Sequence, residues 1–443
     1  MNKLYILGVI ALFSITSITA QEINKEKLDK YFDLVEAYNK GMGSVSIYYN
    51  GKEVYQKSIG FSDLENKIKA NVLTQYRIGS VTKTFTATII MQLAEEGKLA
   101  LNTLLSTYFP RIPNSDKITV ENLLRHSSGL FNITEEKNFM DWVSKPQTRE
   151  DMLSHIIKNG IIFETGEKTQ YSNTNFILLS YIAEDIENKS FSDILKSRII
   201  NPLQLKRTQY GEKINSKNNE ALPYYISETG WKPIEKHTDM SAPMGAGAVV
   251  STASELALFY DALFSSKLVS PSSFAQMTDV SKGIGMGLGG GDINGRKGFG
   301  HEGSIDGFQS MALHLQDEKV SAAYTANGVN ISPLHILTTA LGIYFDANYE
   351  LPSFETIQVD PNDLKKYIGV YASDSAPFKL IILEKDGKLL GGPEGNNNNI
   401  LTPTKPDQFK LESEGVTLDF KSNENTLKLS QGGQVFLFSK EKK

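Results

Sequence analysis

A serine and a lysine three residues apart, Ser80 and Lys83, are the first side chains in this chain that could do chemistry together. On a helix that begins near Ser80, the two side chains lie one turn apart on the same side, close enough for contact. A serine hydroxyl is a weak nucleophile until a base takes its proton, and a neighbouring amine can take or relay that proton. The pair therefore predicts nucleophilic catalysis. The alternative is a serine that only caps a helix beside an exposed lysine.

Two later segments carry further reactive side chains. Tyr171-Ser172-Asn173 follows a turn and comes just before a predicted helix, and His301-Glu302-Gly303 follows a glycine-rich stretch and precedes a predicted strand. Together with Ser80-Val81-Thr82-Lys83, in this order and at this wide spacing, they resemble the motifs of the serine β-lactamase and penicillin-binding protein superfamily. The tyrosine of the second segment is similar to the branch of class C β-lactamases, certain D,D-carboxypeptidases, D-aminopeptidases and lactamase-like esterases.

This resemblance implies catalytic roles for three residues. Ser80 attacks the substrate carbonyl and becomes acylated, Lys83 keeps Ser80 and Tyr171 polarised, and Tyr171 serves as base and then as acid to the leaving group. Because a free tyrosine titrates near 10, a tyrosine base at neutral pH needs its anion stabilised by about 4 kcal/mol. Lys83 is one cation that could supply this stabilisation, and His301 is the other, provided that it is protonated.

The resemblance also implies which residues bind the substrate. Asn173 is expected to hydrogen-bond an amide in the acyl part of the substrate. The backbone N–H groups of Ser80 and Ser304 are expected to form the oxyanion hole, because fixed donors stabilise the negative charge that develops on the carbonyl oxygen. Gly303 is expected to leave room for a substrate that lies along its strand.

The third motif departs from the Lys-Thr-Gly form of the family in two ways. A histidine in place of the lysine, here His301, is similar to relatives that act on peptides and esters. The second position usually carries a hydroxyl that helps to bind a substrate carboxylate, and Glu302 would repel such a group. The prediction is an exported serine hydrolase that cleaves an amide or ester through a Ser80 acyl-enzyme, of esterase or D-amino-acid peptidase or amidase type. Two alternatives stay open: a D,D-carboxypeptidase or β-lactamase proper, and a non-catalytic protein that binds cell-wall peptides.

The first twenty residues are predicted to be a signal peptide rather than part of the fold. Lys3 precedes the apolar run Leu4–Phe13, and small, mixed residues then lead to Ala20. A retained membrane anchor would need about 20 apolar residues, and this run is shorter. The mature protein is therefore expected to be exported, periplasmic or secreted, with no transmembrane anchor after removal of the signal.

The elements expected around these motifs alternate between helix and strand. Gly43–Ile59 predicts a β-hairpin with a turn at Asn50-Gly51. The apolar spacing over 81–97 predicts a helix, although its four alternating threonines are poor helix formers. Further helices are expected at 120–125, 151–158, 175–188, 254–264 and 333–345, and strands at 308–315 and 320–326. The resemblance, which covers roughly residues 39–344, implies an α+β fold: a β-lactamase/transpeptidase-like antiparallel sheet flanked by helices.

The amino-acid pattern of the chain changes near Glu350–Asn362. From Tyr367 onward it consists of short alternating segments separated by turns such as Asp386-Gly387, and the Asn396–Asn399 run is expected to be a flexible hairpin tip. Such a pattern predicts an antiparallel sandwich or barrel, and the resemblance favours a lipocalin-like barrel. The expected division is a signal peptide at 1–20, a hydrolase domain at 21–350, a linker at 351–361 and a C-terminal all-β domain at 362–443.

Composition excludes several other classes of site. The chain has no cysteine, which removes disulfides, thiol catalysis and Cys-ligated metals. None of its six histidines stands in a His-Glu-x-x-His pair, and His126 is expected to hydrogen-bond inside a buried loop rather than to touch substrate. No metal and no cofactor are therefore expected. The net charge of -5 gives no basic face for nucleic acid, so the expected partner is a small-molecule or peptide substrate, with a cell-wall fragment as one candidate.

Overall fold

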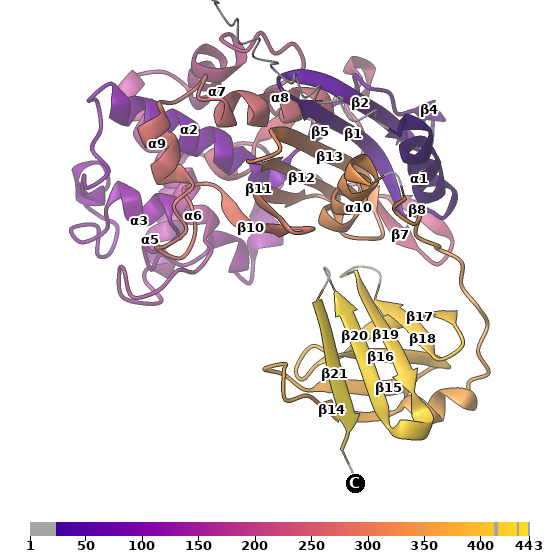
Figure 1. The fold of residues 1–443 in the computed structure, drawn as a ribbon. Helices are drawn as coiled ribbons and strands as arrows, with labels where there is room; N and C mark the ends of the chain where they lie inside the picture. The colour runs from indigo at the N-terminus through magenta and orange to yellow at the C-terminus, as the bar shows by residue number, and fades with distance from the viewer. Residues whose placement is uncertain (1–23, 347, 412–414, 432–433, 442–443) are drawn as a thin grey trace, which may run out of the picture.

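The computed structural model describes residues 24–346, 348–411, 415–431 and 434–441. The predicted signal peptide lies outside the described residues. Figure 1 shows a larger part, built from helices around a sheet, and a β-barrel that follows it after an extended segment. Among the described residues, no helix is both long enough and apolar enough to cross a bilayer.

A six-stranded antiparallel sheet forms the middle of the larger part, in the order β10-β11-β12-β13-β1-β2. The predicted hairpin is confirmed, with Asn50 and Gly51 at positive φ in its turn. The strands span Gly41–Tyr49 (β1), Lys52–Ile59 (β2), Gly289–Ile293 (β10), Arg296–Ile305 (β11), Phe308–Leu315 (β12) and Val320–Val329 (β13).

Helices cover both faces of this sheet. Helices α1 (Lys25–Ala37) and α10 (Pro333–Phe345) pack on one face, and α8 (Ala253–Phe264) packs on the other. Successive side chains of a strand point to opposite faces, so Tyr324 joins the core with α1 and α10, whereas Ala323 joins the core with α8. This layered arrangement confirms the predicted α+β fold.

Helix α2 (Thr82–Glu95) is confirmed despite its alternating threonines. The helix is almost entirely buried, and the threonine hydroxyls bond to the backbone around them. Thr84 Oγ1 donates to the Gly287 carbonyl at 2.8 Å, and Thr86 Oγ1 donates to the Gly245 carbonyl at 2.6 Å. Tertiary packing therefore overrides the low helix propensity of these residues.

The other helices agree with the predictions to within a few residues. The structure has α3 (Val120–Leu124), α5 (Arg149–Asn159) and α6 (Asn173–Glu187). It also has four helices that were not predicted: α1, α4 (Phe139–Trp142), α7 (Phe191–Leu195) and α9 (Pro271–Met277). For α1 the signal was present, because its buried side chains recur at helical spacing behind an Asn24 cap: Leu28, Tyr31, Phe32 and Val35.

Strands β14 to β21 close into an antiparallel barrel, which confirms the predicted barrel fold. Its strands are β14 (Gly369–Ala372), β15 (Leu380–Lys385), β16 (Lys388–Pro393), β17 (Asn399–Lys405), β18 (Gln408–Leu411), β19 (Val416–Lys421), β20 (Thr426–Gln431) and β21 (Gln434–Lys440). Strand β17 was not predicted; it contains Pro403, which sits at a break in the β17–β18 register. The domain boundaries stay a prediction.

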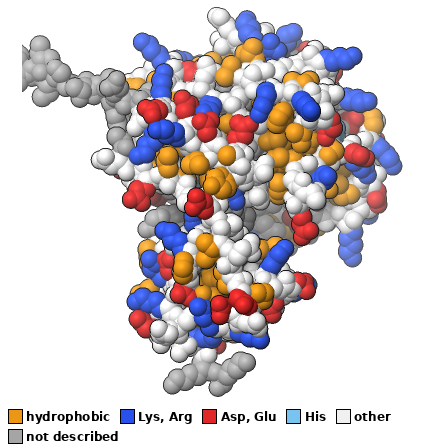
Figure 2. All heavy atoms as spheres, turned by 90° about the vertical axis from the view of Figure 1, so that its right-hand side faces the viewer, with side chains coloured by type: hydrophobic (Ala, Val, Ile, Leu, Met, Phe, Trp, Pro, Cys, Tyr) orange, Lys and Arg blue, Asp and Glu red, His pale blue; other side chains and the backbone are white. Residues whose placement is uncertain are grey.

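Basic and acidic side chains are interspersed on the face of the molecule seen in Figure 2, over the larger part and over the barrel alike. The charges on that face therefore form no patch of a single sign.

Candidate active site

Ser80 lies in the 3-10 turn Gly79–Val81 that leads into α2, and Lys83 lies in the first turn of that helix. The Lys83 side chain is fully buried, and its Nζ donates to Ser80 Oγ at 3.0 Å. The predicted contact between these two side chains is therefore confirmed. Lys83 Nζ also donates to the carbonyl oxygen of Ala246 at 2.8 Å. That carbonyl was not predicted, and it holds the lysine from a segment far away in the sequence.

Tyr171 and Asn173 stand at the start of α6 and face the same pair. The Tyr171 hydroxyl donates to Ser80 Oγ at 2.7 Å, so the serine oxygen lies between a phenol and an amine. Asn173 Oδ1 accepts from Lys83 Nζ at 2.7 Å, and Asn173 Nδ2 donates to Asn132 Oδ1 at 3.2 Å. The amide of Asn173 thus positions Lys83, and its bond to a substrate stays a prediction.

Burial decides the protonation of this pair. It lowers the pKa of Lys83 well below that of an exposed lysine. It also raises the pKa of Tyr171 to about 12, a rise that the hydrogen bond with Ser80 offsets only in part. Both directions favour the uncharged forms. A neutral Lys83 has two hydrogens, which the oxygens of Ala246 and Asn173 can accept, so its lone pair can face Ser80 Oγ and take the serine proton. A protonated Tyr171 can give a proton to a leaving group.

His301 lies on β11, with its ring centroid 6.3 Å from that of Tyr171. Burial, and after it the charge of Lys83, lowers the pKa of His301 to about 4. The ring is therefore neutral at pH 7, and the expectation that a protonated His301 stabilises a Tyr171 anion is wrong at that pH. Its Nδ1 lies 2.5 Å from the Glu302 carbonyl oxygen, which can only accept, so Nδ1 carries the proton and Nε2 is the acceptor.

The backbone of Ser304 is oriented by the hairpin between β11 and β12. Ile305 and Phe308 flank a two-residue turn and form the closing hydrogen-bonded pair. Hydrogen-bonded and non-hydrogen-bonded pairs alternate along an antiparallel ladder, so Ser304, opposite Gln309, is not bonded to β12. Its N–H therefore points away from that strand.

The edge of β11 toward which this N–H points is open. Strand β10 pairs only with residues 296–300 of β11, so its ladder stops before the third motif. Gly79 has positive φ, and a Cβ there would lie 2.7 Å from the nitrogen of Ser304. The N–H of Ser304 thus lies beside the backbone that enters Ser80, which is the arrangement that an oxyanion hole needs.

Gly303 is required by the packing of the protein's own backbone. A side chain at this position would collide with the carbonyl oxygen of Ile78 and would come within 2.6 Å of Ser310 Oγ. Only glycine lets β11 approach the segment before Ser80 this closely. The expectation that Gly303 also leaves room for substrate stays a prediction.

Glu302 is exposed and lines the same opening as Ser80 and Tyr171. Its carboxylate therefore belongs to the mouth of the site.

His126 packs against the ring of Tyr171 and bonds to the backbone next to it, which confirms its expected structural role. It is buried at positive φ, and its Nδ1 accepts from the N–H of Ser172 at 3.1 Å. The ring centroids of His126 and Tyr171 are 4.6 Å apart. Burial lowers the pKa of His126 well below its usual value, so this support is uncharged at neutral pH.

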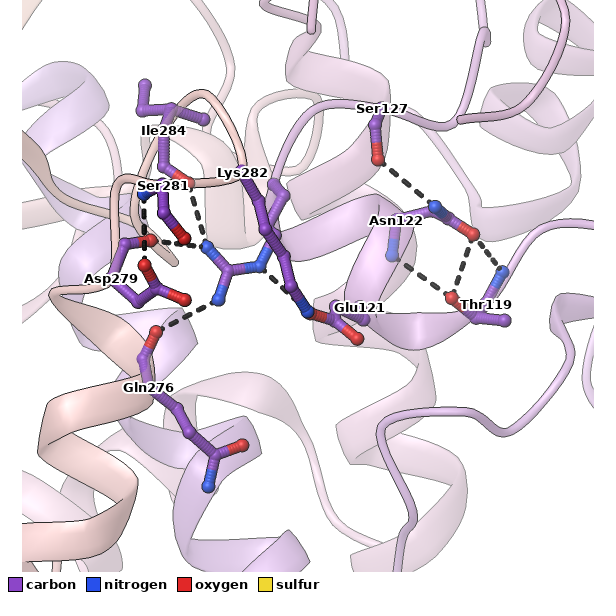
Figure 3. A network of polar contacts seen from close by, with 10 residues as sticks. Thr119, Glu121, Asn122, Ser127, Gln276, Asp279, Ser281, Lys282 and Ile284 are labelled. Carbon is purple, nitrogen blue, oxygen red and sulfur yellow. Dashed lines mark hydrogen bonds and ion pairs between the residues drawn. The ribbon is translucent and has the colours of Figure 1, made fainter. Parts of the chain in front are cut away.

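The residue before His126 anchors this loop to the other side of the helical region. Arg125 is buried and donates to the carbonyl oxygens of Asp279 at 2.7 Å and Gln276 at 3.0 Å. Figure 3 shows these partners, with Lys282 and Glu121 forming a further ion pair beside them. This network explains why the segment around His126 stands out in the sequence although it holds none of the reacting groups.

A buried ion pair joins the two backbone segments that are expected to form the oxyanion hole. Arg77 stands three residues before Ser80, and Asp306 stands two residues after Ser304. Their side chains are 4% and 9% exposed, and Arg77 Nη1 lies 2.6 Å from Asp306 Oδ2. The Thr238 hydroxyl also donates to Asp306 Oδ1, at 2.7 Å. Sequence reasoning missed this pair.

Within the described part of the chain, no three acidic or histidine side chains come close enough together to hold a metal ion.

Comparison with known proteins gives matches over the same region. The family model described as Beta-lactamase matches residues 32–341, more than half of the chain. The chain is 29% identical over 248 residues to the putative penicillin-binding protein PbpX of Bacillus subtilis, covering 56% of this chain and 61% of that protein. It is 29% identical over 246 residues to a teichoic acid D-alanine hydrolase of Staphylococcus aureus, covering 56% and 59%. The match thus spans about three fifths of the length of these curated relatives.

Solved structures agree in fold. The octameric penicillin-binding protein homologue from Pyrococcus abyssi superposes with a TM-score of 0.66 at 24% identity, covering 94% of this chain and all of that chain. The D-amino acid amidase from Ochrobactrum anthropi SV3 complexed with D-phenylalanine gives a TM-score of 0.60 at 25% identity, covering 68% and 92%. The motifs, the fold and the family model agree, and the chain belongs to the beta-lactamase family.

Proposed function

We propose that this protein is a serine hydrolase that cleaves an amide or ester through an acyl-enzyme on Ser80. The observation that carries the proposal is the position of Ser80 Oγ, 3.0 Å from Lys83 Nζ and 2.7 Å from the Tyr171 hydroxyl. A nucleophile within hydrogen-bond distance of both a base and an acid is the signature of covalent catalysis.

The reaction runs in two halves. Lys83 takes the Ser80 proton as the serine oxygen attacks the carbonyl carbon, and the N–H groups of Ser80 and Ser304 hold the negative oxygen. The bond to the leaving group then breaks, Tyr171 gives its proton to the leaving nitrogen or oxygen, and Lys83 returns a proton to Tyr171. Water attacks the resulting ester in the second half, and the acid leaves as Ser80 regains its proton. This order replaces a tyrosinate base, because burial keeps Tyr171 protonated.

The relatives support this reaction class. One is named a teichoic acid D-alanine hydrolase and another a D-amino acid amidase, so similar proteins include hydrolases that act on D-amino acid compounds. We also propose export to the periplasm or the medium, with the signal peptide removed after Ala20 and a hydrolase domain joined through a linker to the barrel. The charge of Glu302 at the mouth of the site disfavours the D,D-carboxypeptidase and β-lactamase alternatives.

Labelling with a fluorophosphonate tests the proposed function and separates it from a peptide-binding protein without catalysis. We expect intact-mass spectrometry to find one adduct per chain on the wild type, and none on Ser80→Ala. Ser106→Ala, at a serine away from the site, is a control that should label normally. A wild type that stays unlabelled and turns over no ester would support the binding protein.

Glu302→Thr tests substrate selection at the mouth of the site. At ~4 Å and an effective dielectric near 20, two like charges repel by roughly 4 kcal/mol, or about a thousandfold in binding. Solvent screens an exposed carboxylate such as Glu302, so we expect a smaller gain of about tenfold to a hundredfold. The measurement is the ratio of kcat/KM for nitrocefin to that for p-nitrophenyl acetate. An equal ratio in both proteins would mean that Glu302 does not select against carboxylates.

A further inference from the structure

Two cavities of different character meet at Ser80. One has a volume of about 480 Å³, and its walls are mainly apolar, among them Ile133, Met140, Trp142, Val143, Ile177 and Ile234. The other, called the polar cavity below, has a volume of about 340 Å³. It differs in the residues that line it, most of which have polar side chains such as Tyr171, Glu302 and Gln309, although apolar atoms of these residues also face it. Ser80 and Ser304 line both cavities, so a carbonyl attacked by Ser80 lies at their boundary.

The position of Tyr171 decides which half of a substrate enters which cavity. Tyr171 lines the polar cavity and is absent from the walls of the apolar one. Its hydroxyl is the group that protonates the leaving atom in the proposed function, on which this inference rests. The leaving group must therefore lie in the polar cavity with Tyr171, and the acyl group in the apolar cavity.

The charges in the apolar cavity restrict the acyl group further. Among the described residues that line it, Asp306 carries the only carboxylate. That carboxylate already accepts from Arg77 at 2.6 Å and from Thr238 at 2.7 Å. Lys236 stands at the exposed rim, with its Nζ bonded to the Met140 carbonyl at 2.6 Å. A substrate with an α-ammonium group would therefore place its charge beside apolar walls and one fully engaged carboxylate, which is unfavourable.

The polar cavity continues toward the barrel. Glu302 and Gln309 line it and also line a third cavity of about 650 Å³, which reaches Gly415 and Gln431 of the barrel. The third cavity adds Asp292 to the acidic lining. This side has room for an extended, polar leaving group, and its acidic groups disfavour an anionic one.

We propose that the substrates are esters or amides of an uncharged, bulky apolar acyl group with a polar leaving group that is neutral or cationic. The apolar cavity is the acyl site, and Ile234 and Met140 at its rim set the preference for acyl size. Burying one CH₂ group is worth about 0.8 kcal/mol, so each methylene that enters the cavity should raise kcat/KM about fourfold. A D-alanyl group is small and cationic, and therefore fits this cavity poorly.

The test compares acyl groups on a fixed leaving group. We expect kcat/KM of the wild type to rise by tenfold or more from p-nitrophenyl acetate to butyrate and hexanoate. We also expect 3-phenylpropanoyl p-nitroanilide to be cleaved at least tenfold faster than D-phenylalanine p-nitroanilide, which differs by the α-ammonium group. A flat or falling ester series, or a preference for the D-phenylalanine compound, would overturn the proposal.

Substitution at the rim links the preference to this cavity. Ile234→Ala should lower the ratio of hexanoate to acetate turnover by about fivefold to tenfold, since it removes apolar contact from the longer chain only. Ile162→Ala is the matched control, because Ile162 is 45% exposed and lines neither cavity, and its ratio should not change. An unchanged ratio in Ile234→Ala would show that another site sets the preference.

Active-site labelling separates the two proposals. If a fluorophosphonate labels Ser80 and p-nitrophenyl acetate is turned over while the chain-length series is flat, the acyl-site assignment fails and the hydrolase function stands. If neither labelling nor turnover of any ester occurs, the proposed function fails and the acyl-site assignment fails with it.

Discussion

Replacing Lys83 with alanine is expected to lower kcat by about three orders of magnitude, which is the range of general base catalysis. The reason is that Lys83 Nζ is the nitrogen that contacts Ser80 Oγ, at 3.0 Å, and that burial lowers the pKa of this amine, which favours its neutral, basic form. Tyr171→Phe should lower kcat to a similar degree, because it removes the hydroxyl 2.7 Å from the same oxygen. Steady-state kinetics with p-nitrophenyl esters measure both effects.

The double variant gives the sharper test. Side chains that act as one unit are far from additive, so Lys83→Ala combined with Tyr171→Phe should lie within about tenfold of the worse single variant. Lys98→Ala is the matched control, because Lys98 is a surface lysine engaged in ion pairs with Glu96 and Glu187. If the fold-reductions in kcat of the two single variants multiply in the double variant, Lys83 and Tyr171 act independently, and the proton path proposed above is contradicted.

Asp306→Asn is expected to impair catalysis mainly by displacing the backbone around Ser80 and Ser304, although Asp306 also lines the proposed acyl site. Arg77 and Asp306 tie the segment before Ser80 to the turn after Ser304, so their pairing sets the distance between the two oxyanion donors. Losing one partner of a buried ion pair costs about 3–5 kcal/mol of folding free energy. Loss of one oxyanion donor lowers kcat by about 10²–10³, and a misplaced donor should cost up to that amount.

The control for Asp306→Asn is a second pair of similar burial far from the site. Arg198 and Glu187 are each 10% exposed and lie 2.8 Å apart. Glu187→Gln should therefore lower the stability measured by denaturant unfolding while kcat stays near that of the wild type. The affinity for a boronic acid, a transition-state mimic, should fall in Asp306→Asn with little change in KM. Equal stability losses and equal kcat values in the two variants would assign Arg77 and Asp306 a purely structural role.

The reacting side chains could be predicted from the sequence. The groups that hold them in place and the burial that sets their protonation mostly could not. Ser80, Lys83 and Tyr171 are rare enough in type and order to identify a family, and the structure brings them into contact. The carbonyl of Ala246 that holds Lys83 has no signature in a sequence, because every residue carries a carbonyl. The neutral state of His301 also escaped prediction, since it depends on burial that only the folded chain creates.

The elements of the fold, too, divide into those that the sequence predicts and those that it does not. Helices and strands with strong apolar periodicity were predicted to within a few residues, as for α10 and β12. Strand β17 was not predicted, and a register break accommodates the proline that it contains, Pro403. Closure of the barrel depends on the pairing of β14 with β21, which joins the two ends of the domain. The alternation of residues within each strand does not specify such a distant pairing.

The contacts that assemble the site also join distant parts of the chain, which has a consequence for folding. Tyr171 bonds to Ser80 across 91 residues, Lys83 to Ala246 across 163, and Arg77 to Asp306 across 229. Contacts of such long sequence separation form late, because the entropy of closing each loop must be overcome first. No partly folded chain that lacks β11 can therefore be active. Recovery of esterase activity during refolding should coincide with the final folding step, and the earlier gain of helical signal should precede it.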